Sequence, residues 1–186
     1  MNIVNRVAVV TGGSRGIGAA FARVASLLGA DVTITYASGK EDAEAVCSDI
    51  RFHTDPSPKC VKVDVTKVLA TSCVESDYDF LCYFATPRIF GKSGGSFELD
   101  RFDRFYEFYC KAFDRIARTF IKKGGAKIYY PSSIAVEQEI RGLEEYKLAK
   151  QIGERVCKTL NLEFDVVTDE DLHIEGVDML NRYRCV

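Results

Sequence analysis

Short apolar runs alternate with amphipathic stretches along most of the chain. Runs rich in β-branched and other apolar residues predict six strands, over residues 6–11, 31–36, 60–65, 79–85, 127–131 and 162–168. Apolar positions at helical spacing predict helices over residues 16–28, 41–51, 97–122 and 144–160. Because strands that alternate with helices favour a parallel sheet with right-handed crossovers, we expect a doubly wound α/β fold in three layers.

Length and composition favour one globular domain over residues 1–186. Of the 186 residues, 47% are hydrophobic, which allows one sizeable core but not two ordinary domains. A formal net charge of −2 gives no sign of the basic face that nucleic-acid binding requires. No apolar run approaches the roughly 20 residues of a membrane helix, and the N-terminus lacks the pattern of a signal peptide. We therefore expect a cytoplasmic protein whose partners are small molecules or proteins.

The cysteines and histidines favour reduced thiols and no metal site. Seven cysteines are scattered without a Cys-x-x-Cys pair, and an odd number leaves any set of disulfides incomplete. Only His53 and His173 supply an imidazole, so we expect no zinc site.

A glycine-rich segment joins the first predicted strand to the first predicted helix. From residue 11 it reads Thr-Gly-Gly-Ser-Arg-Gly-Ile-Gly. Glycines at such a junction let the backbone turn tightly and approach a pyrophosphate, to which the helix N-terminus offers N–H groups and a partial positive charge. A tight turn that binds nothing is the alternative. We expect the segment to bind a dinucleotide through Thr11, Gly12, Ser14, Arg15, Gly16, Ile17 and Gly18.

The spacing Thr-Gly-x-x-x-Gly-x-Gly resembles the cofactor fingerprint of the short-chain dehydrogenase/reductase (SDR) family. The resemblance covers nearly the whole chain and implies a Rossmann-type fold that binds a nicotinamide dinucleotide. Where NAD enzymes usually carry an acid for the ribose 2′-hydroxyl, at the end of the second strand, this chain has Tyr36-Ala37-Ser38. Arg15, together with Ser38 and Lys40, suits a 2′-phosphate, unless these residues are simply solvated. We therefore expect NADP(H) to be preferred over NAD(H).

Two further positions match cofactor contacts of the family. Val63-Asp64-Val65 ends the third predicted strand and resembles the aspartate that bonds the adenine amino group, although a helix-capping role for Asp64 stays open. Ala85 is the last residue of the fourth predicted strand, where the resemblance places one wall of the cofactor site. The family usually has Asn-Asn-Ala-Gly there, whereas this chain reads Tyr-Phe-Ala-Thr from residue 83. That wall is therefore expected to be altered.

A serine, a tyrosine and a lysine form the candidate catalytic set. Tyr146 and Lys150 lie four residues apart on a predicted helix and share one face. A phenol normally titrates near about 10, and a nearby ammonium favours phenolate and lowers that value. Ser133 follows the fifth strand, at the carboxyl edge where open α/β sheets bind ligands. Taken alone, Tyr-x-x-x-Lys and a serine after a strand also arise by coincidence.

The resemblance gives each of the three residues a role. It implies that Tyr146 is the general acid for carbonyl reduction, or the base in the oxidative direction. Lys150 would lower the pKa of Tyr146 and bond the nicotinamide ribose. Ser133 would polarise the substrate oxygen, and the hydride would come from the nicotinamide.

Two more positions depart from the family pattern. In the helix over 97–122 the family often has an asparagine that anchors a proton-relay water, and this chain has Tyr109. Typical members continue after the sixth strand with Pro-Gly, a substrate-covering helical segment and a further strand, whereas this chain reads Asp-Glu-Asp from residue 169. We expect a shortened C-terminal substrate region, and with it an open site, a site completed by a partner, or a bulky tethered substrate.

Aromatic side chains are frequent in the first of the two long predicted helices, at Phe102, Phe105, Phe108, Phe113 and Phe120. They are too numerous for contact with one sheet alone. The matching helices of the family often form a four-helix dimer interface, so we expect a homodimer through the helices over 97–122 and 144–160. Burial within the core of a single chain is the alternative.

Three functions fit these residues. The first is an NADPH-dependent, ketoreductase-like oxidoreductase that reduces a carbonyl on a small or carrier-bound biosynthetic intermediate. The second is a protein that binds NADP(H) without catalysis and acts as a redox sensor or as a scaffold for a partner enzyme. The third keeps the fold but acts as an epimerase or dehydratase. Relatives of that third kind have a different glycine spacing and a longer C-terminal region, so we rank it last.

Overall fold

The computed structural model describes residues 4–54, 57–89, 96–124 and 127–160. Contacts divide the chain into two compact units, and each is described by itself. The sheet unit comprises residues 3–86 and 111–130, and the described part of the helical unit lies within residues 87–110 and 131–160. The predicted strand over 162–168 lies outside the described residues.

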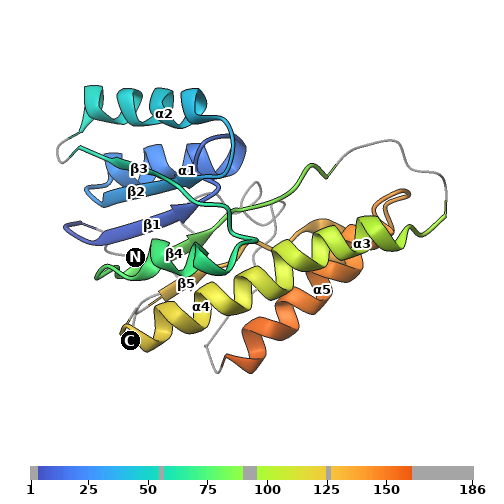
Figure 1. Ribbon diagram of the computed structural model, residues 1–186. Helices are drawn as coiled ribbons and strands as arrows, with labels where there is room; N and C mark the ends of the chain where they lie inside the picture. The colour runs from blue at the N-terminus through green and yellow to red at the C-terminus, as the bar shows by residue number, and fades with distance from the viewer. Residues whose placement is uncertain (1–3, 55–56, 90–95, 125–126, 161–186) are drawn as a thin grey trace. The chain divides into compact units, whose positions relative to one another are not determined.

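The sheet unit is built on parallel strands, which are β1 Val7–Thr11, β2 Asp31–Tyr36, β3 Lys59–Lys62, β4 Phe80–Tyr83 and β5 Lys127–Tyr129. They lie in the order β3-β2-β1-β4-β5, and every pair of neighbours is parallel (Figure 1). This order confirms the doubly wound α/β fold expected from the sequence. The chain steps outward in opposite directions from β1, so the carboxyl ends of β1 and β4 form the switch point at which such sheets bind ligands.

Helices cover both faces of this sheet: α1 Gly16–Leu27 and α2 Lys40–His53 on one, and α4 Phe113–Lys122, with the 3-10 helix η1 Val68–Val74, on the other. The two faces follow from right-handed crossovers, because the β1–α1–β2 and β4-to-β5 connections step in opposite directions. In agreement, α1 contacts α2 and β2, whereas α4 contacts β4 and η1. Small side chains at Ala19, Ala22 and Ala25 let α1 pack closely on the core residues Val10, Val32 and Ile34.

Three strands end before their predicted limits. β2 matches its prediction at both ends, but β3, β4 and β5 stop at Lys62, Tyr83 and Tyr129. Single hydrogen bonds continue past two of these ends, from Val63 N–H to the Tyr36 carbonyl (2.8 Å) and from Phe84 N–H to the Thr11 carbonyl (3.0 Å). The residues beyond become loops at the carboxyl edge, where the sequence predicts the cofactor site.

The predicted helix over 97–122 is interrupted by a wider turn. The chain forms α3 Leu99–Tyr106, then the π-helix η2 Glu107–Ala112, and then α4. A π-turn shifts the helical phase by one residue, and such turns are frequent at functional sites. In the helical unit, α3 packs against α5 Glu144–Thr159, which begins at its predicted residue and ends one residue before its predicted limit. The 3-10 helix η3 Ile134–Val136 also contacts α5.

A buried ion pair joins α3 to the start of α5. Glu145 is 1% exposed, and its Oε2 lies 3.5 Å from Nη1 of Arg101, as a charged contact without a hydrogen bond. Glu145 Oε1 accepts the Glu98 N–H at 2.7 Å. Arg101 Nη2 donates to the carbonyls of Ile89 (3.2 Å) and Gly142 (2.9 Å). The pair thereby fixes the loops that precede α3 and α5, and α5 carries Tyr146 and Lys150.

Two glycines allow β1, α1 and the chain after β4 to meet. A Cβ on Gly12 would lie 2.8 Å from the Phe84 carbonyl oxygen and 2.9 Å from Ala85 Cα, and Gly12 has a φ of +70°. A Cβ on Gly18 would lie 2.5 Å from the Gly12 carbonyl oxygen. Because both obstacles are backbone atoms, neither can move aside as a flexible side chain would. The βα turn therefore requires glycine at both positions.

We expect Gly18→Ala to lower the free energy of unfolding by about 3 kcal/mol, because the new methyl group overlaps the Gly12 carbonyl. Urea unfolding followed by circular dichroism measures the change. Gly124→Ala is the matched control, since no atom lies within 4 Å of its Cβ and only the φ of +84° opposes the substitution. It should cost about 1 kcal/mol. Equal losses for the two variants would contradict the close approach at Gly18.

We expect Glu145→Gln to lower the free energy of unfolding by about 3 kcal/mol, because the amide leaves the Arg101 guanidinium buried without its counter-charge. The same urea titration measures this loss. Asp114→Asn is the control, because Asp114 pairs with Arg118 on the exposed surface of α4 at 2.8 Å. Its loss should stay under about 0.5 kcal/mol. A Glu145→Gln loss as small as that of the control would show that the buried pair does not stabilise the fold.

Candidate active site

The carboxyl edge of the sheet gathers most of the predicted cofactor residues. Thr11 ends β1 and Gly12 follows it, Ser38 follows β2, Asp64 follows β3 and Ala85 follows β4. These strands are neighbours in the sheet, and the Gly13 N–H donates to the Thr35 carbonyl across β1 and β2 at 3.1 Å. The structure thus brings residues from four loops to one edge, where open α/β sheets bind ligands.

The N-terminus of α1 is open to an anion. Arg15 occupies the N-cap with an extended backbone and no side-chain capping bond, and the first turn of α1 contains no acidic residue. Gly16 has a φ of +54°, and a Cβ on it would meet no atom within 4 Å. The start of α1 therefore lacks a capping side chain and has open space beside Gly16, in contrast to the tightly packed Gly12 and Gly18, and such a helix start can bind a phosphate.

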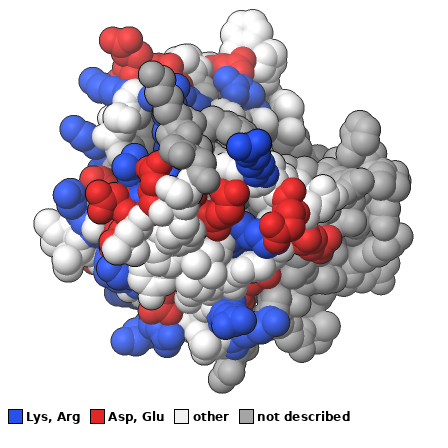
Figure 2. Space-filling model, turned by 90° about the vertical axis from the view of Figure 1, so that its right-hand side faces the viewer, with Lys and Arg blue, Asp and Glu red and all other residues white. Residues whose placement is uncertain are grey.

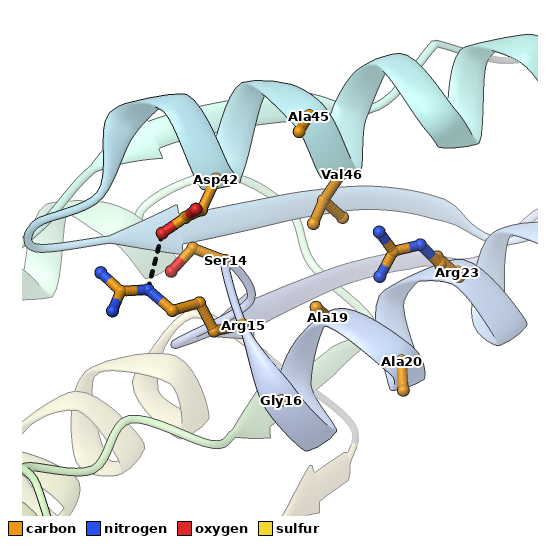
Figure 3. A pocket seen from close by; sticks show the side chains of 9 residues that line it. All are labelled: Ser14, Arg15, Gly16, Ala19, Ala20, Arg23, Asp42, Ala45 and Val46. Atoms are coloured by element: carbon orange, nitrogen blue, oxygen red, sulfur yellow. Dashed lines mark ion pairs between the residues drawn. The ribbon is translucent and has the colours of Figure 1, made fainter.

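Arg15 lies across the loop that joins β2 to α2. Its Nε is 2.7 Å from Oδ2 of Asp42, and Figure 3 shows this ion pair at the edge of a pocket. Its Nη2 lies 2.5 Å from the position of a Cβ on Gly39, a residue with a φ of +77°. The guanidinium therefore sits beside Gly39, the residue that follows Ser38, in the region where the sequence predicts the contact to a ribose 2′-phosphate.

An open pocket of about 360 Å³ runs between α1 and α2 from this point (Figure 3). Its lining includes Ser14, Arg15 and Gly16 from the predicted cofactor set. Further along, Arg23 lines it and pairs with Asp49 of α2, Nε to Oδ2, at 2.5 Å. Two arginines of α1 thus each face an aspartate of α2. Only the glycine-turn end of this pocket belongs to the predicted site.

Several residues of the predicted cofactor site have buried side chains or side chains that bond to residues close by in the sequence. The side chains of Thr11 and Tyr36 are buried, so the edge exposes little beyond their main chain. Asp64 accepts hydrogen bonds at Oδ1 from the Thr66 hydroxyl (2.7 Å) and the Thr66 N–H (3.0 Å). The Thr66 hydroxyl is the main cause that lowers the pKa of Asp64. Lys40 forms an exposed pair with Glu44, Nζ to Oε1, at 3.4 Å.

Aromatic rings pack on one another beside the altered wall after β4. The Phe84 ring lies 5.2 Å from Phe21 of α1 and 5.5 Å from Tyr129 of β5, measured between ring centroids. Phe21 and Tyr129 also stack at 5.8 Å. The ring at position 84 therefore contributes to packing against α1, while Ala85 supplies the small residue closest to Gly12.

In the helical unit, Ser133 and Lys150 are tied to one segment. Ser133 caps η3, and its Oγ accepts the Ala135 N–H at 3.3 Å, so its own hydrogen can be donated to a substrate oxygen. Lys150 Nζ donates to the Pro131 carbonyl at 2.6 Å, and the Ser132 hydroxyl donates to the Glu154 carboxylate. Two bonds from α5 therefore hold the segment that carries Ser133.

Tyr146 and Lys150 lie one turn apart on α5 and are both buried, with 7% and 4% exposure. The Tyr146 ring packs edge-to-face on Phe105 and on Tyr109, each at 5.6 Å between centroids. The Lys150 ammonium lies 4.3 Å from the centroid of the Tyr109 ring. A phenol and an ammonium therefore share a largely dry site, where electrostatic effects are stronger than in water.

Sequence reasoning missed three contributors to these sites. Asp42 pairs with Arg15, and Glu154 accepts a hydrogen bond from Ser132. The Pro131 carbonyl accepts a hydrogen bond from Lys150. The only sequence signal for Asp42 was the acidic pair Glu41-Asp42 at the start of α2. Such a pair is equally typical of any helix N-terminus, where acidic residues favour the helix dipole. A backbone carbonyl gives no sequence signal at all.

Charged side chains of both signs are interspersed on the face that Figure 2 shows. Such a distribution produces no large field of one sign, in agreement with the net charge of −2. Among the described helices, none combines the length and apolar character that crossing a bilayer requires.

Comparisons with known proteins agree with the geometry. A family model for short chain dehydrogenases matches residues 6–75, which include β1, the glycine turn and α2. The short chain dehydrogenase/reductase dmxR18 of Cryptosporiopsis sp. is 35% identical over 141 residues, which cover 70% of this chain and 52% of that protein. The chloroplastic NADPH-dependent aldehyde reductase-like protein of Arabidopsis thaliana is 52% identical over 83 residues, or 41% of this chain and 30% of that protein. The chain spans about half the length of the first relative and less of the second.

The fold is also found among solved structures. A short-chain dehydrogenase/reductase from Serratia marcescens has 26% sequence identity and a TM-score of 0.76, with 86% of this chain and 69% of that one covered. The parallel sheet, the glycine turn and the relatives agree with one another. The chain belongs to the short-chain dehydrogenase/reductase family.

Proposed function

We propose that this chain is an NADP(H)-dependent oxidoreductase that reduces a carbonyl. The observation that carries the proposal is the cluster in the helical unit, where α5 buries Tyr146 and Lys150 one turn apart and bonds the segment that carries Ser133. The family assigns a catalytic role to these three positions. The relatives are named as dehydrogenases and reductases, and one name includes NADPH.

The residues of the sheet unit fit a nicotinamide dinucleotide. Gly16 and the uncapped start of α1 offer N–H groups to a pyrophosphate, and Gly12 keeps the turn close to Ala85. Arg15 would bond a ribose 2′-phosphate, because its guanidinium lies beside Gly39 and no carboxylate ends β2.

The chain's own groups would position and protonate the substrate. Ser133 would donate its hydroxyl hydrogen to the carbonyl oxygen, and Tyr146 would transfer its phenolic proton to the same oxygen. The positive charge of Lys150 would stabilise the phenolate that remains, because the two side chains share a buried face of α5. A bound nicotinamide would supply the hydride.

A small or carrier-bound carbonyl compound is the proposed substrate, and a second copy of the chain is the proposed partner. Phe105, Phe113 and Phe120 are fully buried within the chain, which favours a core role for these three. Phe102 is only partly buried, and Phe97 and Leu99 beside it are exposed. These side chains, on and just before α3, are the proposed contribution to a homodimer.

The alternative is a cofactor-binding subunit without catalysis, acting as a redox sensor or a scaffold. The wall after β4 supports it, because Phe84 packs on Phe21 and Tyr129 where the family usually has a polar Asn-Asn pair. NADPH binding without turnover, together with co-purification of a partner enzyme, would favour this function over the first.

Arg15→Ala is expected to weaken NADPH binding by about tenfold to a hundredfold, because a charge-assisted bond to the 2′-phosphate is lost. Binding of NADH should change by less than about twofold. Asp42→Asn should strengthen NADPH binding by about threefold, because the carboxylate that competes for Arg15 is removed. Calorimetric titration of both cofactors against each variant measures the effects. Equal losses of NADPH and NADH affinity in Arg15→Ala would mean that Arg15 does not recognise the 2′-phosphate.

Tyr146→Phe is expected to lower kcat by about 10²-fold to 10⁴-fold on any ketone or aldehyde that the chain reduces, because the proton donor is lost. The assay follows NADPH oxidation at 340 nm over a panel of carbonyl compounds. Tyr106→Phe is the control, since it removes a phenol on α3 outside the cluster. Activity that survives Tyr146→Phe would exclude this tyrosine as the acid.

A further inference from the structure

The face of the Tyr109 ring covers the ammonium of Lys150. Nζ lies 4.3 Å from the ring centroid, well within the distance at which an ammonium is attracted to an aromatic face. Lys150 is 4% exposed and Tyr109 is 2% exposed, so little water separates or screens the two groups. The attraction between a cation and a ring is strongest in such desolvated places.

The Tyr109 ring is held in this orientation by its neighbours. It stacks on Phe105 at 6.0 Å and packs edge-to-face on Tyr146 at 5.6 Å. It also lies within the π-helix Glu107–Ala112, and the wider turn changes the direction in which residue 109 points relative to a regular helix. The ring therefore contacts both Tyr146 and Lys150 from a fixed position.

A buried ammonium needs hydrogen-bond acceptors or aromatic faces that stabilise its charge. Burial favours the neutral amine, which would remove the charge that acts on the Tyr146 phenol. The Pro131 carbonyl accepts one N–H of Lys150 at 2.6 Å, in a direction fixed by the backbone. An ammonium has three donors, and an aromatic face can receive the charge without a directional bond.

We propose that Tyr109 is a positioning residue that holds the Lys150 ammonium through its ring face and keeps the charge beside Tyr146. The hydroxyl of Tyr109 is not required for this role. The inference rests on the proposed function for the role of Tyr146, but the contact between ring and ammonium is a separate physical claim that can be measured without turnover.

Other ionisable groups near Lys150 have contacts of their own. Burial raises the pKa of Cys110 to about 12 and that of Cys157 to about 11, so both thiols stay protonated through the neutral range. Cys110 also donates its S–H to the Ala149 carbonyl at 3.3 Å. Glu154 is bonded by Ser132, and Glu145 faces Arg101. A substitution of the Tyr109 ring removes none of these groups.

The test is an NMR titration of Lys150 in the whole chain labelled with [13C]lysine. The ¹³Cε signal of Lys150 is assigned by its absence in Lys150→Arg. Tyr109→Phe keeps the ring face and should leave the titration midpoint of the wild type unchanged. Tyr109→Leu removes the ring and should lower the midpoint by about one pH unit, as expected for the loss of a desolvated cation–π contact.

A second substitution keeps the ring and changes only its charge distribution. Replacing Tyr109 by pentafluorophenylalanine preserves the aromatic packing but reverses the polarity of the ring face. The titration midpoint of Lys150 should therefore fall. This variant also provides the test if Tyr109→Leu does not fold. Phe105→Leu is the comparison variant, because it removes the buried ring stacked on Tyr109 and keeps the ring that lies against Lys150. Its midpoint should fall by much less than that of Tyr109→Leu.

Two results would overturn the inference. One is a midpoint that does not differ between phenylalanine and pentafluorophenylalanine at position 109. The other is a fall in Phe105→Leu as large as that in Tyr109→Leu, which would assign the effect to loss of packing. If the chain is active, Tyr109→Leu should also lower kcat by about tenfold and move its pH profile, with little change in KM. If it is inactive, the titration still decides the contact, so the two proposals fail separately.

Discussion

The contact between Gly12, Gly18 and the backbone after β4 is the constraint on which the sheet unit depends. The Gly12 carbonyl occupies the space of a side chain at position 18, and the backbone of Phe84 and Ala85 occupies the space at position 12. Because neither glycine has a side chain, backbone atoms can occupy this space. The chain can then leave β1 and enter α1 while staying in contact with the segment after β4. The first N–H groups of α1 are then held at the switch point of the sheet, with Gly16 facing open space.

Burial of charge is the corresponding constraint in the helical unit. Glu145 and Arg101 neutralise each other at the start of α5, and Lys150, one turn beyond Tyr146, is bound by a carbonyl and an aromatic face. Replacement of a buried pair by apolar residues is often neutral for stability, so stability alone does not explain why these charges are kept. The proposed proton transfer from Tyr146 would be helped by a positive charge held beside the phenol, because that charge stabilises the phenolate that remains.

The sequence was sufficient for the fold and for the location of the glycine turn, because both depend on local periodicity. β2 was predicted at both ends, since Gly29 and Gly39 lie close to its limits. The π-turn was not predicted, because positions 108 and 109 are both aromatic and the sequence therefore shows no break where the phase of the apolar pattern shifts. The aromatic stripe was assigned to include Phe108, whereas the shifted phase buries Tyr109 and leaves Phe108 partly exposed. Tertiary pairs such as Arg15 with Asp42 depend on how α1 and α2 pack, which no local pattern specifies.

The ion pair between Arg15 and Asp42 bears on two proposed roles of the glycine turn, which are binding of a pyrophosphate and recognition of a 2′-phosphate. A guanidinium at the N-cap of α1 adds positive charge where the helix dipole already favours an anion, and Asp42 offsets part of that charge. Because both side chains are half exposed, the pair is weak and can open when a stronger acceptor arrives. A dianionic 2′-phosphate is such an acceptor, whereas a ribose hydroxyl is not. If Arg15 binds the cofactor as proposed, selectivity between the two nicotinamide cofactors would depend on a competition between two acceptors for one arginine, rather than on the arginine alone.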